Sequence, residues 1–190
     1  MFSEKWKNEV FTIPNLLSLF RIGLIPVYIT LYLGAAEKLD YLLSGSVLAL
    51  SCLTDMADGV IARKFHMITN VGKILDPLAD KLTQLALILC LSAKYPVLYP
   101  VLALFLAKEL FQCITLVFFA QKGKALPGAL PAGKLCTTVL FLSLLLLVLF
   151  PNIRISSVMI LTWIDMVFLL YSLVSYLFAY WGSRNCLTDL

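Results

Sequence analysis

Long apolar stretches recur along the whole chain and constrain its fold more than any other feature. Each has about 20 residues, mainly Leu, Val, Ile, Phe and Ala, which as a helix is long enough to cross a hydrocarbon core of roughly 30 Å. Lipid cannot satisfy backbone polar groups, and the alternation typical of barrel strands is missing, so helices are the predicted spanning form. The six stretches cover approximately residues 11–34, 40–63, 71–93, 97–120, 132–150 and 155–181.

The composition agrees with a membrane environment. Apolar residues make up 61% of the 190 residues and charged residues only 14%, a balance far from that of a soluble domain. The connections between the stretches are short and leave no room for a separate soluble domain. We therefore predict an all-α fold, a polytopic bundle of six transmembrane helices that forms a single membrane domain over residues 1–190.

The N-terminal segment FSEKWKNEV carries acids as well as lysines, which is unlike a cleavable signal peptide. We expect it to form a short amphipathic helix at the membrane interface, with Phe2, Trp6 and Val10 toward lipid. Membrane lipids are thus expected partners. The sequence shows no nucleic-acid-binding motif, and nucleic acid is not an expected partner. The cysteines form no CxxC pair and are interpreted as packing thiols.

Basic residues in the connections predict the orientation, because they concentrate on the cytoplasmic side of membrane proteins. With the N-terminus inside, the cytoplasmic side carries Lys5, Lys7, Arg63, Lys64, Lys122, Lys124 and Arg184. The opposite side carries Lys38, Lys94 and Arg154. We therefore expect both termini in the cytoplasm.

Four aspartates occur close together in a chain that otherwise avoids charge. Asp55 and Asp58 share one face of the second predicted helix, with Gly59 and Ala62 on the same stripe. Beyond a short connection, Asp76 and Asp80 follow Gly72 at intervals of four and form a second stripe at the start of the third helix. Two adjacent antiparallel helices would bring the four carboxylates into one cluster that opens toward the cytoplasm.

Such a cluster requires positive charge, because like charges repel strongly in a partly desolvated site. The candidate ligands are hard oxygens, which favour Mg²⁺ or Mn²⁺, and no suitably placed Cys or His favours zinc. Four carboxylates suit two divalent cations, an arrangement that recurs in displacement at phosphorus. Gly59 and Gly72 would let a ligand approach the backbone, and Arg63 adds a cation for phosphate or carboxylate. Gly59 and Ala62 would equally permit close helix packing.

A cation transporter is an alternative from another class, since its intramembrane carboxylates bind the transported ion. Transport predicts carboxylates distributed along a path across the bilayer. Here they cluster near one face, beside an arginine and two glycines. This placement favours a fixed phosphate site.

The residues from Asp55 to Asp80 resemble the DxxDGxxARx8GxxxDxxxD signature of the CDP-alcohol phosphatidyltransferases at every defining position. The entry segment IPNLLSLFRIGLIPVY, with Pro14, Asn15 and Arg21, is similar to the bacterial phosphatidylglycerophosphate and cardiolipin synthase branch. The resemblance implies an enzyme of a bacterial cell membrane with its active site facing the cytoplasm. It also implies transfer of a phosphatidyl group from CDP-diacylglycerol to an alcohol, with release of CMP.

The resemblance further implies roles for the matching residues. Two divalent cations would be held by Asp55, Asp58, Asp76 and Asp80. Asp80 would also take the proton from the acceptor hydroxyl. The CDP pocket would be lined by Asp58, Gly59, Ala62, Arg63 and Gly72. A homodimer is also among the partners considered.

The acceptor most in keeping with the resemblance is glycerol 3-phosphate, and phosphatidylglycerol, which would yield cardiolipin, is the alternative. A phosphate acceptor needs cations beyond the metals, and the candidates are Lys81, Lys108 and Lys134. Lys134 lies in GKLCT, which resembles the branch's GKxxT, whereas Lys108-Glu109 stands where the branch is expected to have Arg-Glu. Asp165 lies deep in the last stretch, and the sequence shows no partner for it.

Overall fold

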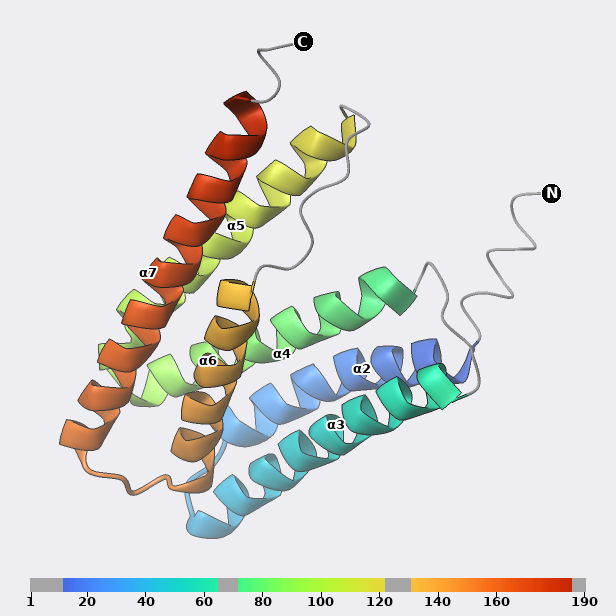
Figure 1. Ribbon diagram of the computed structural model, residues 1–190. Helices are drawn as coiled ribbons and strands as arrows, with labels where there is room; N and C mark the ends of the chain where they lie inside the picture. The colour runs from blue at the N-terminus through green and yellow to red at the C-terminus, as the bar shows by residue number, and fades with distance from the viewer. Residues whose placement is uncertain (1–11, 65–71, 122–130, 186–190) are drawn as a thin grey trace. The chain divides into compact units, whose positions relative to one another are not determined.

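The computed structural model describes residues 12–64, 72–121 and 131–185, and in these ranges all regular structure is helical (Figure 1). The helices are α2 (Ile13–Leu33), α3 (Lys38–Lys64), α4 (Gly72–Lys94), α5 (Tyr99–Gln121), α6 (Pro131–Leu149) and α7 (Ile155–Asn185), with a 3-10 turn η1 (Pro96–Leu98) before α5. The all-α prediction is confirmed, and the six predicted stretches coincide with the six long helices to within a few residues. The expected interfacial helix at residues 2–10 lies outside the described residues.

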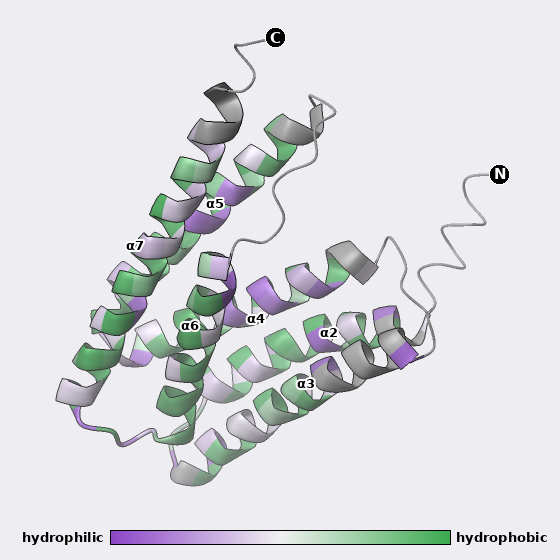
Figure 2. Ribbon diagram, viewed as in Figure 1, coloured by the Kyte–Doolittle hydropathy of each residue, from purple (hydrophilic) through white to green (hydrophobic). Residues whose placement is uncertain are grey.

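Four of these helices are long and apolar enough to cross a membrane. The qualifying segments within the described ranges are Asn15–Leu33, Pro96–Phe118, Pro131–Leu149 and Ile155–Trp181. Hydrophobic residues predominate along α6 and α7, whereas hydrophilic residues are frequent on α4 (Figure 2). The two long helices outside this set, α3 and α4, are those that carry the predicted acidic cluster.

The chain divides into two compact units, with the boundary inside α4 between Cys90 and Leu91. In the first unit, α2 and α3 form an antiparallel hairpin with closely packed backbones. The hairpin turn is closed by Asp40, whose Oδ2 accepts hydrogen bonds from the backbone N–H groups of Ala36 and Glu37 at 2.9 Å each. Next to the turn, the rings of Tyr32 and Tyr41 pack edge to face with centroids 5.4 Å apart.

The second unit consists of the end of α4, η1, and helices α5 to α7. Helix α7 packs against both α5 and α6, and Leu140 and Leu144 of α6 and Leu169 of α7 are buried. The hydroxyl of Tyr95 donates a hydrogen bond to the carbonyl of Pro151 at 2.8 Å, which ties the segment before η1 to the turn between α6 and α7.

Gly133 marks a close approach within the second unit. A Cβ atom at this position would lie 2.5 Å from the hydroxyl oxygen of Tyr176, which is closer than real Cβ contacts. The glycine of the GKLCT segment therefore has a packing role at the start of α6. Cys52, Cys90, Cys113 and Cys136 are free thiols, and the buried Cys90 and Cys136 fit the predicted packing role, whereas Cys113 is exposed.

Candidate functional site

Helix α2 contributes a polar face to the candidate site. Asn15, Ser18 and Arg21 follow one another at intervals of three and are 1%, 0% and 2% exposed. Residues with this spacing share one face of a helix, so α2 turns three polar side chains inward although most of its sequence is apolar. In a membrane helix, inward polar residues pair with other polar groups, and the partners of Ser18 and Arg21 are carboxylates.

Those carboxylates come from α3 and α4. Arg21 Nη1 lies 2.6 Å from Asp55 Oδ1 and donates a hydrogen bond to Asp80 Oδ1 at 2.5 Å. Ser18 Oγ donates to Asp76 Oδ1, also at 2.5 Å. One turn of α2 thus holds three of the four predicted aspartates, and the guanidinium bridges the two helices that carry them.

Burial differs sharply between the two sides of this ionic contact. The side chain of Arg21 is only 3% exposed, whereas those of Asp55 and Asp80 are 46% and 53% exposed. The arginine therefore lies beneath the carboxylates and the carboxylates face outward. A ligand would meet carboxylate oxygens first, with the guanidinium behind them.

Carboxylates outnumber cations in this group of described side chains. Three carboxylates and one guanidinium leave two net negative charges among Asp55, Asp76, Asp80 and Arg21. Asp80 also lies within electrostatic range of both Asp55 and Asp76. Half-exposed hard oxygens with a net negative charge suit a divalent cation such as Mg²⁺ or Mn²⁺.

The described carboxylates do not by themselves form a metal-binding site. Among the described residues, no three acidic, cysteine or histidine side chains converge closely enough to hold a metal ion. Asp55 and Asp80 instead meet at the guanidinium of Arg21. The fourth predicted ligand, Asp58, lies one turn beyond Asp55 on α3, and its side chain is outside the described set.

The other residues assigned to the CDP pocket are only partly described. Gly59, Ala62 and Arg63 lie in the last turns of α3, but their side chains are likewise outside the described set. Gly72 is buried and is the first residue of α4, four residues before Asp76.

The three candidate acceptor lysines have different environments. Lys81 follows Asp80 on α4 and is half-buried, and Lys134 is exposed in the first turn of α6. Lys108 on α5 is 2% exposed, and its Nζ lies 2.7 Å from Oε1 of the adjacent Glu109. This ion pair offsets the cost of placing the lysine in a buried position.

Asp165 has a partner, contrary to what the sequence suggested. Ser143 Oγ on α6 donates a hydrogen bond to Asp165 Oδ2 on α7 at 2.5 Å, and both side chains are buried. The contact lies within the second unit, where Cys136 is within electrostatic range of Lys108 and Asp165. The serine in the apolar α6 sequence was the available signal for this pair.

Sequence reasoning also missed the function of the α2 face. Asn15 and Arg21 were noticed only through the family resemblance, and Ser18 was not noticed at all. The available signal was the interval of three that places polar residues on one face of an otherwise apolar span. The structure shows that this face organises the predicted aspartates.

Fold and site together define an all-helical membrane protein whose polar site lies among three helices and collects aspartates from two of them. The family model described as CDP-alcohol phosphatidyltransferase matches residues 11–171. The chain belongs to this family. With four helices apolar enough to span a bilayer, it is an integral membrane protein.

Curated relatives carry one recurrent name, CDP-diacylglycerol–glycerol-3-phosphate 3-phosphatidyltransferase. The relative from Rickettsia bellii is 41% identical over 98 residues, which is 51% of this chain and 53% of that protein. The relative from Pseudomonas fluorescens is 32% identical over 118 residues, 61% of this chain and 60% of that protein. The chain thus spans little more than half of these two proteins. The relative from Salmonella paratyphi A is 32% identical over 178 residues, 91% of this chain and 97% of that protein.

Proposed function

We propose that this protein transfers the phosphatidyl group of CDP-diacylglycerol to glycerol 3-phosphate, producing phosphatidylglycerophosphate and CMP. The observation that carries the proposal is the bridge from Arg21 to Asp55 and Asp80, because it joins the two halves of the acidic motif at one place. The names of the relatives support glycerol 3-phosphate as the acceptor over phosphatidylglycerol. Membership of an enzyme family disfavours the cation-transporter alternative.

Two divalent cations, Mg²⁺ or Mn²⁺, would be held by the four aspartates of the motif. Members of the family generally depend on divalent cations. When bound, such ions neutralise the pyrophosphate and stabilise the departing CMP. The carboxylates provide hard oxygen ligands. Arg21 contacts those of Asp55 and Asp80, and Ser18 donates a hydrogen bond to that of Asp76. Asp58 would complete the set.

Asp80 would serve as the general base. Its carboxylate is 53% exposed and is hydrogen-bonded to Arg21 through Oδ1, which fixes its orientation. The acceptor oxygen would attack the phosphorus that carries the diacylglycerol, forming a new P–O bond while the pyrophosphate linkage to CMP breaks. The hydroxyl proton would pass to Asp80 as that bond forms. Positioning of the two substrates is the remaining contribution of the protein.

The nucleotide would bind over the last turns of α3 and the start of α4. Gly59, Ala62 and Gly72 would leave space for it, and Asp58 and Arg63 would contact it. The burial of Gly72 at the first position of α4 supports an inward-facing backbone there. Lys81, Lys108 and Lys134 stay candidates for the phosphate of the acceptor, and the pairing of Lys108 with Glu109 would fix the direction of its ammonium group.

We infer that all six helices cross the membrane as one catalytic domain, with the N-terminal segment at the interface. Helices α3 and α4 contain 27 and 23 residues, which at 1.5 Å per residue gives about 40 Å and about 34 Å, enough to span the bilayer. Asp55 lies in the last part of α3, and Asp76 and Asp80 lie in the first part of α4. The polar ends of both helices therefore belong to the same side, which would be the cytoplasmic side. Formation of a homodimer stays a prediction.

The proposal is tested by product analysis. Purified protein would be incubated with Mg²⁺, CDP-diacylglycerol labelled in an acyl chain, and in turn glycerol 3-phosphate, phosphatidylglycerol, glycerol or inositol phosphate. Thin-layer chromatography should show labelled phosphatidylglycerophosphate only with glycerol 3-phosphate. Labelled cardiolipin formed from phosphatidylglycerol, without phosphatidylglycerophosphate, would contradict the proposed acceptor.

A further inference from the structure

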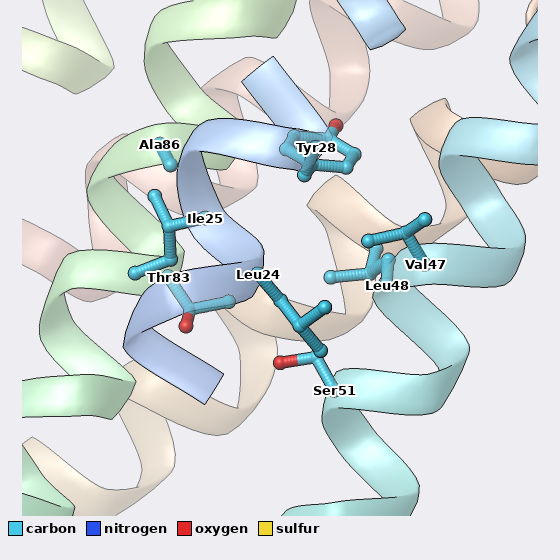
Figure 3. A pocket seen from close by; sticks show the side chains of 8 residues that line it. All are labelled: Leu24, Ile25, Tyr28, Val47, Leu48, Ser51, Thr83 and Ala86. Carbon is cyan, nitrogen blue, oxygen red and sulfur yellow. The ribbon is translucent and has the colours of Figure 1, made fainter. Parts of the chain in front are cut away.

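Each of the two units contains polar contacts between helices that otherwise pack through apolar side chains. In the first unit these contacts surround Arg21, and the layer next to them is apolar, with Leu24 and Ala86 among its residues (Figure 3). The cavity in that layer is only about 10 Å³, room for about one water. In the second unit a buried hydrogen bond joins Ser143 of α6 to Asp165 of α7. The proposed reaction assigns no role to this second contact.

Buried residues of α6 and α7 form two stripes along these antiparallel helices, which pack against each other (Figure 1). Each stripe repeats at intervals of three and four, the spacing that keeps residues on one face of a helix. The α6 stripe includes Gly133, Cys136, Leu140, Ser143 and Leu147, and the α7 stripe includes Val158, Thr162, Asp165, Leu169 and Ser172. Because the spacing is regular, apolar packing alone changes little when one helix slides along the other by a turn.

Two contacts distinguish one register from the others. Near the start of α6, Gly133 faces Tyr176, and a Cβ atom at the glycine would lie 2.5 Å from the tyrosine hydroxyl oxygen. Ten residues later, Ser143 Oγ donates a hydrogen bond to Oδ2 of Asp165, which precedes Tyr176 by eleven residues. At 1.5 Å per residue these steps are about 15 Å and about 17 Å. Both contacts therefore belong to the same antiparallel register.

A slide of α6 by one turn would break both contacts. A residue with a side chain would come to face Tyr176, whose ring leaves no space for one. Asp165 would face Leu140 or Leu147, and its carboxylate would be buried without the hydrogen bond from α6. An unpaired buried carboxylate is strongly unfavourable, whereas lost apolar contacts can be replaced by lipid. The polar pair thus selects a register that apolar packing leaves open, as single buried polar residues do in coiled coils.

The hydrogen bonding of Asp165 favours such a role over a contribution to stability. The side chain is 1% exposed, and within the described residues its Oδ1 accepts no hydrogen bond. A buried carboxylate with one oxygen unpaired stabilises a fold poorly, and an apolar pair of similar size often packs equally well. The pair therefore specifies an arrangement of helices that an apolar pair would leave undetermined.

The register determines where the first turn of α6 lies. Lys134 directly follows Gly133, is exposed, and is a candidate for the phosphate of the acceptor. Lys108 of α5, another candidate, lies within electrostatic range of Cys136, two residues after Lys134. A slide by one turn would move Lys134 by roughly 5 Å. This displacement exceeds the length of the charge-assisted hydrogen bond, about 2.8 Å, by which the lysine would hold a phosphate.

We propose that Asp165 is a positioning residue. Through its hydrogen bond with Ser143 it fixes the register of α6 against α7, and it thereby holds Lys134 where this lysine binds the phosphate of glycerol 3-phosphate. The role in acceptor binding rests on the proposed function, whereas the register does not. Asp165 itself takes no part in the transfer of the proton or of the phosphatidyl group.

Removal of both partners separates positioning from stability. Ser143→Ala combined with Asp165→Leu leaves no buried polar group unpaired, so its unfolding midpoint should stay within about 4 °C of that of the unmodified protein. The KM for glycerol 3-phosphate should nevertheless rise by about tenfold, and the KM for CDP-diacylglycerol should change by less than about twofold. Asp165→Asn retains an oxygen that accepts the hydrogen bond of Ser143, and it should keep the KM for glycerol 3-phosphate within about threefold.

Thr162→Val is the matched control. Thr162 is 4% exposed and lies one turn before Asp165, but its hydroxyl donates to the backbone carbonyl of Val158 in the same helix at 2.8 Å. The change removes a hydrogen bond within α7 only, and both KM values should stay the same. An unchanged KM for glycerol 3-phosphate in the double variant would overturn the inference. Equal rises in both KM values, or a rise in Asp165→Asn as large as in the double variant, would also overturn it.

Disulfide formation measures the register directly and requires no turnover. Cys136 lies beside Ser172, so Ser172→Cys should form a disulfide with Cys136 on mild oxidation, identified by mass spectrometry of peptides. Leu169→Cys, one turn away on the same face of α7, should form little. With Ser143→Ala and Asp165→Leu added, the two yields should become similar. A preference for position 172 that survives loss of the pair, or equal yields while the pair is intact, would overturn the inference.

The kinetic and disulfide measurements separate this inference from the proposed function. Absence of turnover in the unmodified protein with any acceptor would contradict the proposed function, and the disulfide yields would still decide whether the pair fixes the register. Loss of the preferred disulfide in the double variant, together with an unchanged KM for glycerol 3-phosphate, would overturn the role assigned to Lys134.

Discussion

Replacement of Arg21 by Met removes the positive charge beneath the carboxylates while keeping a side chain of similar length. Arg21 is 3% exposed and makes two contacts, at 2.6 Å and 2.5 Å, with Asp55 and Asp80. Without the guanidinium, the three carboxylates face one another with no compensating charge in this group. The variant should therefore be destabilised when no divalent cation is present.

The size of the effect follows from the exposure of the two partners. A hydrogen bond to a charged group contributes about 1.5–3 kcal/mol when buried, whereas an exposed ion pair contributes about 0–1 kcal/mol. Asp55 and Asp80 are about half exposed, so we take about 1 kcal/mol for each contact and about 2 kcal/mol for both. For a chain of this size, that loss lowers the midpoint of thermal unfolding by about 4–8 °C.

The assay is thermal unfolding in detergent, followed by the loss of the monodisperse peak in size-exclusion chromatography. In EDTA, Arg21→Met should unfold about 4–8 °C below the unmodified protein. Mg²⁺ should raise its midpoint by more than it raises that of the unmodified protein, because the ion supplies positive charge that the variant lacks. Arg21→Lys should fall between the two, since an ammonium group lacks the planar fork that bridges two carboxylates.

Arg154→Met is the matched control, because Arg154 is exposed and lies in the turn before α7. Its midpoint should match that of the unmodified protein in EDTA and in Mg²⁺. An Arg21→Met midpoint in EDTA equal to that of the unmodified protein would refute the reasoning. So would an equal response of both proteins to Mg²⁺.

Three further predictions concern the other polar contacts. Replacement of any one of Asp55, Asp58, Asp76 or Asp80 by Asn should nearly abolish transfer while the chromatographic profile is kept, and substantial activity in two of these variants would argue against two metals. EDTA should stop turnover, Mg²⁺ or Mn²⁺ should restore it, and Ca²⁺ should restore it poorly. Ser143→Ala removes the hydrogen bond to Asp165 and should cost about 1–3 kcal/mol of stability, measured as a lower unfolding midpoint, whereas the exposed Ser46→Ala should not; an unchanged midpoint for Ser143→Ala would show that the contact contributes nothing. Lys134→Ala should raise the KM for glycerol 3-phosphate by about tenfold to hundredfold and that for CDP-diacylglycerol much less, and an equal rise in both would exclude a specific role in acceptor binding.

The helices were predictable because a membrane leaves few alternatives for the backbone. A long apolar stretch must form a helix, and its ends follow from the prolines and charges around it, as at Lys38 and Lys94. Asp55 and Asp80 were predictable as neighbours because only a short connection separates α3 from α4. These inferences depend on local pattern and on chain connectivity.

The contacts that organise the site were harder to predict from the sequence. Ser18 and Asp76 are separated by 58 residues, and Arg21 and Asp80 by 59. The interval of three between the polar residues of α2 marks its inward face, but it does not indicate which helices that face meets, so the bridging role of Arg21 required the packed structure. Asp165 and Ser143 are only 22 residues apart, but their contact depends on the rotation of α7 against α6, which two almost uniformly apolar sequences do not specify.

The central claim is that the carboxylate site held by α2 performs metal-dependent phosphatidyl transfer. Its most direct test is release of labelled CMP from cytidine-labelled CDP-diacylglycerol by the unmodified protein, by Asp80→Asn, and by Glu37→Gln as a matched change at an exposed acid in the α2–α3 turn. We predict release that requires both glycerol 3-phosphate and Mg²⁺, is unchanged in Glu37→Gln, and is lost in Asp80→Asn with the same chromatographic profile. Release by Asp80→Asn at the rate of the unmodified protein, or release that persists in EDTA, would contradict the claim.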